Sequence, residues 1–287
     1  MIPRAAIVAW RRVAPWASDA QVEQDLVISR VLVDLFSDEF LRDHLAFRGG
    51  TALNKLFFHP ATRYSEDIDL VQTRAGPIGQ ILDRIRERLA WLGEDPRRDR
   101  GPDVMHVVYA FDSEIEPIER LRLKIEINTR EHESVLPRIE VPFEVANRWF
   151  SGSALIPTYA LEELLGTKLR ALYQRKKGRD LYDFAVAFER ASVDDEQVVR
   201  SFQAYMRMVG DTVTRAQFEA NLAAKMGNVA FRADVVPLLR AGARYDVDEA
   251  YRLVLERLIS RLEGEPWKGL VPAGTDEVPS LIDESKD

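Results

Sequence analysis

Two aspartates separated by a single residue, Asp67 and Asp69, lie in the segment TRYSEDIDLVQ, which has the pattern of a β-strand. Alternate residues of a strand project from the same face, so both carboxylates point one way while Ile68 and Leu70 point the other. Two close carboxylates repel each other unless a cation lies between them. Mg²⁺ prefers hard oxygen ligands and commonly binds one or two carboxylates together with substrate phosphates. The pair therefore predicts a magnesium site, with Mn²⁺ as the alternative ion.

A second segment with a strand pattern, LRLKIEINT, supplies a third carboxylate. Glu126 shares a face with Lys124 and Asn128, opposite the apolar residues of the segment. If this strand runs beside the first, the three acids can hold two metal ions, one at an attacking hydroxyl and one on a triphosphate. Taken alone, an Asp-x-Asp pair also fits two solvated strand residues, and metal-dependent glycosyltransferases use the same pattern.

A two-glycine turn precedes the aspartates in the segment FRGGTALNKLFF. Gly49 and Gly50 allow the backbone to approach a phosphate closely, and the free N–H groups of a helix start favour anions. Thr51 adds a hydroxyl and can equally cap the helix. In the following loop, Arg63 and Ser65 offer a cation and a hydroxyl near the expected phosphate position. An exposed loop arginine is as often a solvated charge, so both interpretations of Arg63 stay open.

Chemistry-bearing residues also occur in the second half of the chain. Lys168 lies within the apolar stripe of a predicted helix, where an amine costs free energy unless it is paired or reaches water. The amine can snorkel to water or contact a bound triphosphate, and the family resemblance described below favours the triphosphate. Asp180 can cap the next helix, orient Lys168 or Arg179, or lie near the acceptor. Asp183, one turn later, is assigned a supporting role.

A short basic cluster lies in an otherwise acidic protein with a formal net charge of −7. Such runs are usually solvated faces. Beside a metal site, this cluster can instead guide an RNA phosphate backbone, so it is the candidate RNA-binding patch. Its members are Arg170, Arg175, Lys176, Lys177 and Arg179.

The pattern of helices and strands predicts an α/β (α+β) domain over residues 1–150 and a helical domain over residues 151–267. The boundary is expected at the turn between Phe150 and Gly152, and the residues from 158 to about 173 are expected to form a helix capped by Thr158. Ser18 begins a capping box for an earlier helix, and the run EDPRRDRGPD is expected to be a loop. Residues 268–287 are rich in Gly, Pro and acid and are predicted to be disordered.

Composition excludes several other chemistries. The chain has no cysteine, which excludes disulfides, thiolate zinc sites and cysteine nucleophiles. Neither a signal peptide nor the roughly 20 apolar residues of a membrane helix is found, so we expect a cytoplasmic protein with no membrane partner. The histidines are scattered without metal-ligand spacing and are assigned no role: His44, His59, His106 and His132.

Together these motifs resemble those of the AbiEii/MenT nucleotidyltransferase toxins of the polymerase-β-like superfamily. FRGGTALNKLFF with RYSEDIDLV resembles the first motif, and LKIEIN the strand with the third carboxylate. ALEELLGTKLRALYQRKKGRDLYDFA resembles the two later motifs. The resemblance covers roughly residues 20 to 190. Many superfamily members have Gly–Ser where this chain has Gly50–Thr51, and threonine keeps the hydroxyl.

The resemblance implies a bilobed protein with a central active-site cleft. It also implies transfer of a nucleoside monophosphate from an NTP with release of pyrophosphate, in MenT-like members to the 3′ end of tRNA, and a cognate antitoxin. On this basis Asp67, Asp69, Glu126, Lys168 and Asp180 are the expected catalytic residues. Two alternatives stay open: an enzyme that modifies protein hydroxyls or a small molecule, and a catalytically silent module that binds nucleotide or antitoxin.

Overall fold

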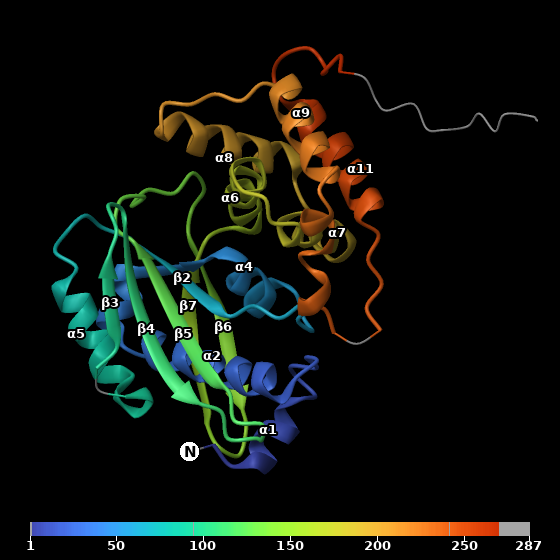
Figure 1. The fold of residues 1–287 in the computed structure, drawn as a ribbon. Coiled ribbons are helices and arrows are strands. Elements are labelled where there is room, and N and C mark those ends of the chain that lie inside the picture. The colour runs from blue at the N-terminus through green and yellow to red at the C-terminus, as the bar shows by residue number, and fades with distance from the viewer. Residues whose placement is uncertain (1, 94, 241, 270–287) are drawn as a thin grey trace, which may run out of the picture.

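The computed structural model describes residues 2–93, 95–240 and 242–269, and in these the strands form a seven-stranded mixed sheet of order β3-β4-β5-β2-β1-β7-β6 (Figure 1). The strands are β1 (Leu45–Arg48), β2 (Asp67–Gln72), β3 (Arg97–Arg100), β4 (Val104–Asp112), β5 (Arg120–Asn128), β6 (Ile139–Ala146) and β7 (Ser151–Thr158). The central pair β2 and β5 is parallel, whereas β1 and β4 run antiparallel to these neighbours.

Helices precede, interrupt and follow the sheet. Before and among the strands lie α1 (Arg4–Trp10), α2 (Asp19–Phe36), α3 (Glu39–His44), α4 (Gly49–Ala52), the π-helical turn η1 (Leu53–Phe57), α5 (Gly79–Arg88) and η2 (Ala90–Leu92). After the strands lie α6 (Leu161–Gln174), α7 (Arg179–Arg190), α8 (Asp195–Met208), α9 (Arg215–Met226), α10 (Val229–Ala233), η3 (Val236–Leu238), α11 (Val247–Arg257) and η4 (Ile259–Arg261). No helix of the described residues is long and apolar enough to cross a membrane.

The strand β2 shows how the sheet serves two purposes. Ile68 and Leu70 face a core formed with α2 and α5, whereas Asp67, Asp69 and Val71 project from the other face. Val71 packs into a second core that the later helices build. One face of β2 therefore carries the apolar Ile68 and Leu70, and the other passes from carboxylates to a buried valine along the strand.

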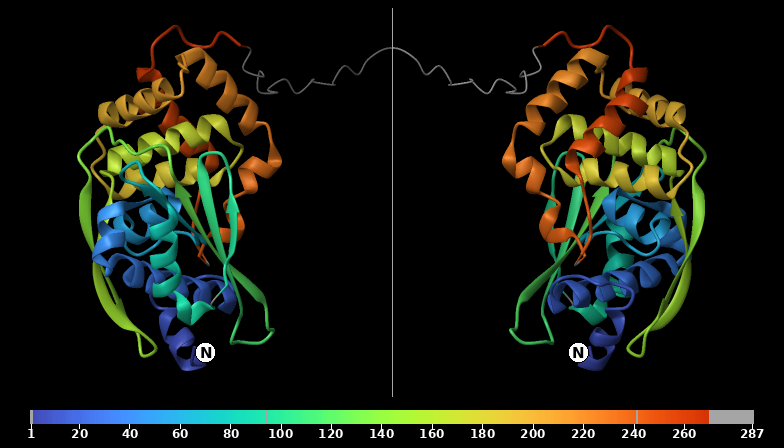
Figure 2. Two further views of the ribbon diagram at one scale, coloured as in Figure 1. Left: turned by 90° about the vertical axis from the view of Figure 1, so that its left-hand side faces the viewer. Right: turned by 90° about the vertical axis from the view of Figure 1, so that its right-hand side faces the viewer.

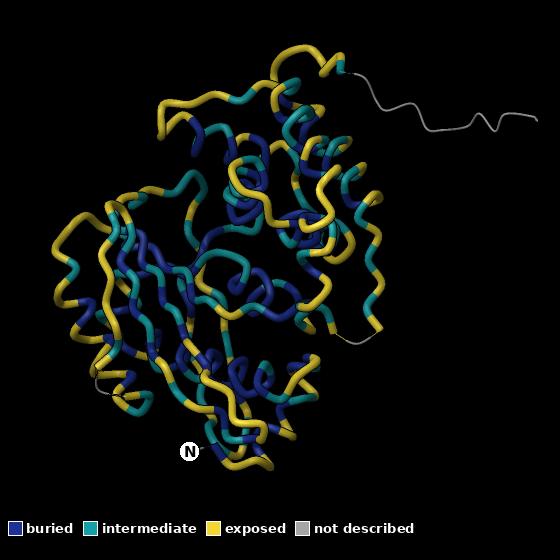
Figure 3. The backbone as a smooth tube through the Cα atoms, viewed as in Figure 1, coloured by how far each residue is buried: buried dark blue, intermediate teal, exposed yellow. Residues whose placement is uncertain are grey.

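The later helices lie together on one side of the sheet-containing part, as Figures 1 and 2 show. Their core joins apolar residues of α6, α7, α8, α9 and α11 to Ala46 of β1, Leu53 of η1 and Val71 of β2. In Figure 3, buried backbone runs through the central strands and α6, while the edge strand β3 is exposed along its length. The helical part is thus anchored to the sheet at β1, β2 and η1.

Several sequence-based boundaries are corrected. The turn expected at Phe150–Gly152 is followed by a strand rather than by helices, because β7 begins at Ser151 and pairs with β6 over its whole length, and α6 starts only at Leu161. Thr158 does not cap α6; its hydroxyl donates to the carbonyl of Phe47. The expected loop at 94–103 contains β3. Of the predicted disordered tail, residues 270–287 lie outside the described residues.

Candidate active site

Three carboxylates meet on one face of the β2–β5 pair. In the parallel register, Asp69 lies beside Glu126 and Asp67 lies beside Lys124. Burial, together with the neighbouring Glu126, raises the pKa of Asp69 to about 7. Burial also raises the pKa of Asp67. The expected juxtaposition of the three acids is therefore present, and it concentrates negative charge that calls for a cation or a proton.

Glu126 is held by two basic neighbours. The ammonium of Lys124 contacts Glu126 Oε1, and His106 Nδ1 lies 3.2 Å from the same atom. Burial alone would raise the pKa of Glu126, but hydrogen bonds from Lys124 and Asp69 outweigh it and the pKa is lowered. His106, which the sequence analysis assigned no role, therefore belongs to this site.

The three carboxylates suit a divalent cation by their donor chemistry. They are hard oxygen ligands on one face, and the most buried of them, Asp69, gains a proton readily because its charge is poorly compensated. As the side chains stand, no group of three acidic or histidine residues among the described residues is arranged to hold a metal ion. Glu126 would turn from Lys124 to complete the ligand set with Asp67 and Asp69.

The backbone of the turn between β1 and α4 packs closely against these carboxylates. Gly49 has φ +82°, and a Cβ at this position would lie 2.1 Å from Asp69 Oδ2. A Cβ on Gly50 would lie 2.5 Å from Arg63 Nη2 and 3.5 Å from Lys168 Nζ. Any side chain at Gly49 would displace Asp69, so the glycine is required by both conformation and space.

The hydroxyl of Thr51 fastens the loop before β2 to the glycine turn. Thr51 Oγ1 lies 2.8 Å from Ser65 Oγ and also donates to the carbonyl of Asp67. The N-cap of α4 is Arg48, so the alternative N-cap role of Thr51 is not seen. Thr51 is buried, whereas Ser65 is half-buried and lines the pocket.

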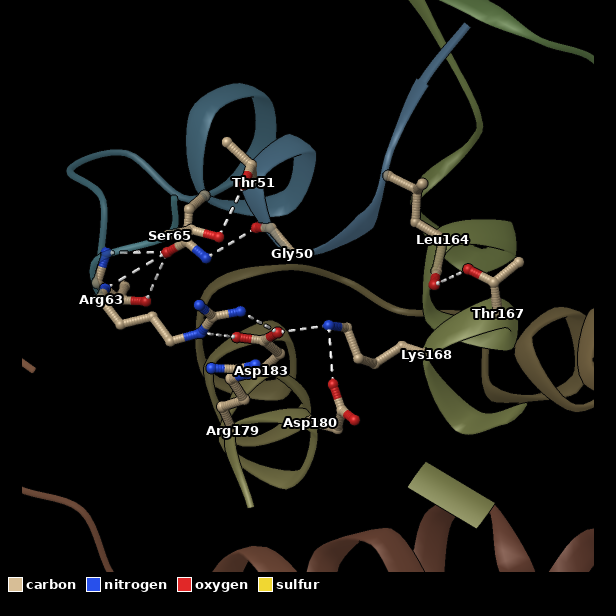
Figure 4. Close-up of polar contacts among 12 residues, drawn as sticks. Gly50, Thr51, Arg63, Ser65, Leu164, Thr167, Lys168, Arg179, Asp180 and Asp183 are labelled. Atoms are coloured by element: carbon tan, nitrogen blue, oxygen red, sulfur yellow. Dashed lines mark hydrogen bonds and ion pairs between the residues drawn. The ribbon is translucent and has the colours of Figure 1, made fainter. Parts of the chain in front are cut away.

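Two buried aspartates of α7 organise the cations on the opposite wall (Figure 4). Asp183 accepts two 2.7 Å hydrogen bonds from Arg63, and Lys168 Nζ lies 2.8 Å from Asp183 and 3.1 Å from Asp180. Asp180 in turn accepts two 2.7 Å hydrogen bonds from Arg175. The three cations outnumber the two carboxylates by one, which leaves positive charge facing the pocket.

This network bears on the expectations for Arg63, Asp180 and Lys168. Arg63 is not an exposed loop arginine, because its guanidinium is buried against Asp183. Asp180 orients Lys168 as one expectation held, but its other partner is Arg175 rather than Arg179. Burial opposes ionisation of Asp180, yet the nearby Lys168 and Arg175 lower its pKa to about 2. The Lys168 amine therefore has two anionic partners and is held at a fixed position.

The expected basic cluster is divided between different environments. Arg170 is mostly buried, with its guanidinium 2.8 Å from Glu131 and over the ring of Tyr205. Lys177 and Arg179 lie 3.8 and 4.0 Å from Asp234. Arg175 is bound to Asp180, and Lys176 is exposed. These residues do not form one free patch.

A second cluster of charged residues, Arg48, Glu131 and Arg170, was not predicted from the sequence. Glu131 lies between Arg48 and Arg170, with Arg48 Nη1 at 2.5 Å. Burial opposes its ionisation, but the two guanidiniums lower the pKa of Glu131 to about 2. This cluster connects the end of β1 to α6. No local sequence pattern predicts it, because Arg48 and Arg170 are 122 residues apart.

The two walls enclose one polar pocket between the sheet and the later helices. It is lined by Gly50, Thr51, Arg63, Tyr64, Ser65, Glu66, Asp67, Asp69, Glu126, Lys168, Arg175, Arg179 and Leu238. Carboxylates thus lie on the sheet side, and cations on the helical side. Such a pocket can hold a polyphosphate against the cations while a metal-binding face meets its reactive phosphorus.

Comparison with known proteins agrees with this geometry. A family model described as the nucleotidyl transferase AbiEii toxin of type IV toxin–antitoxin systems matches residues 30–253. The structure resembles the nucleotidyltransferase toxin MenT4 of Mycobacterium tuberculosis H37Rv, at 18% identity and a TM-score of 0.63, covering 92% of this chain and 91% of that one. It also resembles JHP933 of Helicobacter pylori, at 16% identity and a TM-score of 0.53, covering 84% and 92%. A search of curated protein sequences finds no match.

The fold and the pocket define a nucleotidyltransferase, an enzyme of mixed α/β architecture. Because the family model spans most of the sequence, the chain belongs to the AbiEii nucleotidyltransferase toxin family. Membership implies an NTP substrate and an antitoxin partner. Nucleotidyltransferases of this kind generally use divalent metal ions.

Proposed function

We propose that this toxin transfers a nucleoside monophosphate from an NTP to a hydroxyl of RNA, most directly the 3′ end of tRNA, with Mg²⁺ bound by Asp67, Asp69 and Glu126. Mn²⁺ would satisfy the same oxygen ligands. The observation that carries the proposal is that three carboxylates on the sheet face, across one pocket, the cations Arg63, Lys168 and Arg175, which two buried aspartates hold. A binding module without turnover would have no use for a close group of acids in which burial and the neighbouring Glu126 raise the pKa of Asp69.

The helical wall supplies the triphosphate contacts in this proposal. Lys168 is held by Asp180 and Asp183, so its amine is already positioned when the nucleotide arrives. Because Gly50 has no side chain, Arg63 and Lys168 lie close to its backbone at the pocket. Ser65 adds a hydroxyl to the pocket lining. Arg63 supports Asp183 and acts on the nucleotide through that aspartate and Lys168.

The sheet wall supplies the acceptor chemistry. The acceptor hydroxyl oxygen forms a bond to the α-phosphorus, the bond from that phosphorus to the bridging oxygen breaks, and pyrophosphate leaves. The hydroxyl proton passes to Asp69 or Glu126, the carboxylates on the sheet side of the pocket. A divalent ion, when bound, would acidify the hydroxyl and neutralise the phosphates.

The wider biological setting belongs to the same proposal. A bilobed arrangement, with the sheet and the later helices as lobes and the pocket as their cleft, would let the two walls close on the nucleotide. The structural likeness to MenT4, a nucleotidyltransferase toxin, supports the role of a toxin for this chain. We infer a cytoplasmic enzyme, because NTPs and RNA are found there, and a cognate antitoxin that neutralises it.

The acceptor is tested by following the transferred label. Purified protein is incubated with each α-³²P-labelled NTP, Mg²⁺, and total cellular RNA and protein, and the two fractions are separated. We expect label in RNA of tRNA size, removed by 3′-exonuclease. Label in the protein fraction would support modification of protein hydroxyls instead, and label in neither fraction would support a silent binding module.

A further inference from the structure

The active-site pocket opens into a second hollow on the same face of the sheet. A groove of about 570 Å³ shares Tyr64, Glu66 and Asp67 with the pocket. It continues along β5 past Lys124 and Arg122 toward Arg120. The two hollows therefore form one path that begins at the catalytic carboxylates and leads away from the helical part.

The cations of β5 lie on the same face of the sheet as the catalytic carboxylates. Arg120, Arg122, Lys124 and Glu126 are alternate residues of one strand and share the face that carries Asp67 and Asp69. At a rise of about 3.3 Å per residue, Arg122 lies roughly 13 Å along the strand from Glu126. A chain bound over Arg122 would thus reach the carboxylates with its end.

The cations of the groove differ in how fully they are engaged. Lys124 contacts Glu126, and Arg120 lies 2.9 Å from Asp112. Arg122 is exposed, and within the part of the chain that the structure describes it has no carboxylate at ion-pair distance. Its backbone carbonyl is held by Gln24 Nε2 at 2.9 Å, so the strand beneath the free guanidinium is fixed.

The direction of transfer favours the same path for the acceptor. The attacking and leaving oxygens lie roughly in line across the transferred phosphorus. The triphosphate occupies the side of Lys168 and Gly50 in the proposed function, so the acceptor must enter from the opposite side. That side is the groove, whose lining residues Arg120 and Arg122 are exposed.

We propose that the groove along β5 binds the single-stranded 3′ end of the RNA acceptor, with Arg122 contacting a backbone phosphate. The inference rests on the proposed function, which it deepens by assigning the acceptor subsite. The helical segment that carries Arg175, Lys177 and Arg179 is the weaker candidate, because each of those cations already has an aspartate partner. Arg122 offers the same charge without a competing carboxylate.

The test compares the full-length wild type with Arg122→Gln, Arg122→Glu and the control Arg200→Gln, which removes an exposed arginine from α8. We measure anisotropy of a labelled single-stranded RNA ending in a 3′ hydroxyl, over a range of salt. We also measure KM for RNA and for NTP in the transfer reaction. Arg122→Gln should raise the RNA Kd and KM roughly fivefold and flatten the salt slope by about one contact. Arg122→Glu should raise the RNA Kd and the RNA KM further. Neither Arg122 variant should change the KM for NTP, and Arg200→Gln should bind RNA as the wild type does.

The outcomes separate the subsite from the reaction. If both Arg122 variants transfer to RNA with an unchanged RNA KM and salt slope, the groove is not the RNA subsite, and the proposed function is unaffected. Arg122-dependent RNA binding without any transfer by the wild type would support the groove and defeat the reaction. Label only in protein, with no RNA binding, would overturn both. Thermal unfolding of each variant checks that the exposed substitution leaves the fold intact.

Discussion

Asp69 is the residue where the electrostatic cost of the site is greatest. Its carboxylate is buried beside Glu126, and its pKa is raised from the ordinary aspartate range to about 7. The folded state therefore holds a proton that the unfolded chain has lost, and stability falls as the pH rises from about 4 to about 7. Above pH 7 the whole cost is present unless a cation offsets it.

Replacing Asp69 with Asn should remove this cost. In EDTA at pH 8, Asp69→Asn should be more stable than the wild type by about 1–2 kcal/mol, and the gain should shrink toward pH 5. Urea unfolding at the two pH values measures it. Adding Mg²⁺ should stabilise the wild type and leave the variant unchanged. Equal stability of the two proteins in EDTA at pH 8 would show that Asp69 carries no such burden.

Lys168 combines a structural and a proposed catalytic role. From the sequence alone, Met in an apolar stripe should cost little, but the amine lies between two fully buried carboxylates. Lys168→Met should therefore lower the free energy of unfolding by about 3 kcal/mol as well as weaken NTP binding.

The matched control is Lys55→Met, because Lys55 is likewise buried, 2.6 Å from Asp25, and lies outside the pocket. Both variants should lose stability, measured by urea unfolding. NTP affinity, measured by calorimetry at a temperature where both are folded, should fall only for Lys168→Met. Equal affinities would restrict Lys168 to a structural role.

At the scale of elements, the turn from β1 into α4 sets the distance between backbone and metal face. Gly49→Ala would bring a methyl group 2.1 Å from Asp69 Oδ2 in a left-handed conformation, so either the turn or the carboxylate must move. We expect about a 100-fold loss of transfer rate, since displacements near 1 Å can cost that much.

The control for this turn is Gly79→Ala at the start of α5, where an added Cβ meets open space. Its transfer rate should equal that of the wild type, and its stability should rise slightly because alanine favours helix. Steady-state rates at saturating NTP decide the comparison. Normal turnover by Gly49→Ala would mean that Asp69 need not stay where the structure has it.

Local signals explain which elements could be predicted. The capping box of Ser18 and Gln21 begins α2 as expected, because the signal lies within four residues. The alternation in β2 and β5 likewise predicted which face carries the acids. By contrast, β3 is a run of four charged residues, and only its pairing with β4 makes it a strand.

Long-range partners explain what the sequence could not show. Arg63 is buried because Asp183 meets it from 120 residues away, and nothing near Arg63 indicates that partner. His106 joins the site only through the register of β4 with β5. The family resemblance was accurate at the motifs, but the pairing between motifs required the three-dimensional structure.

At the scale of the whole molecule, one pocket unites segments that are far apart in the chain. The sheet contributes the acids, and α6 and α7 contribute the lysine and its aspartates (Figures 1 and 4). The second core ties these helices to β1, β2 and η1, so the two walls form one framework. We therefore expect a change on either wall to stop the same reaction.

The most direct test compares transfer by the wild type and Asp67→Asn from two NTP preparations, each labelled at a different phosphate. With ³²P at the α-position or the γ-position and RNA as acceptor, the wild type should place only α-label in RNA and release one pyrophosphate per transfer. EDTA or Asp67→Asn should abolish both, with the variant's fold preserved by circular dichroism. Incorporation of γ-label, or transfer by Asp67→Asn in Mg²⁺ at the wild-type rate, would contradict nucleotidyl transfer at these carboxylates.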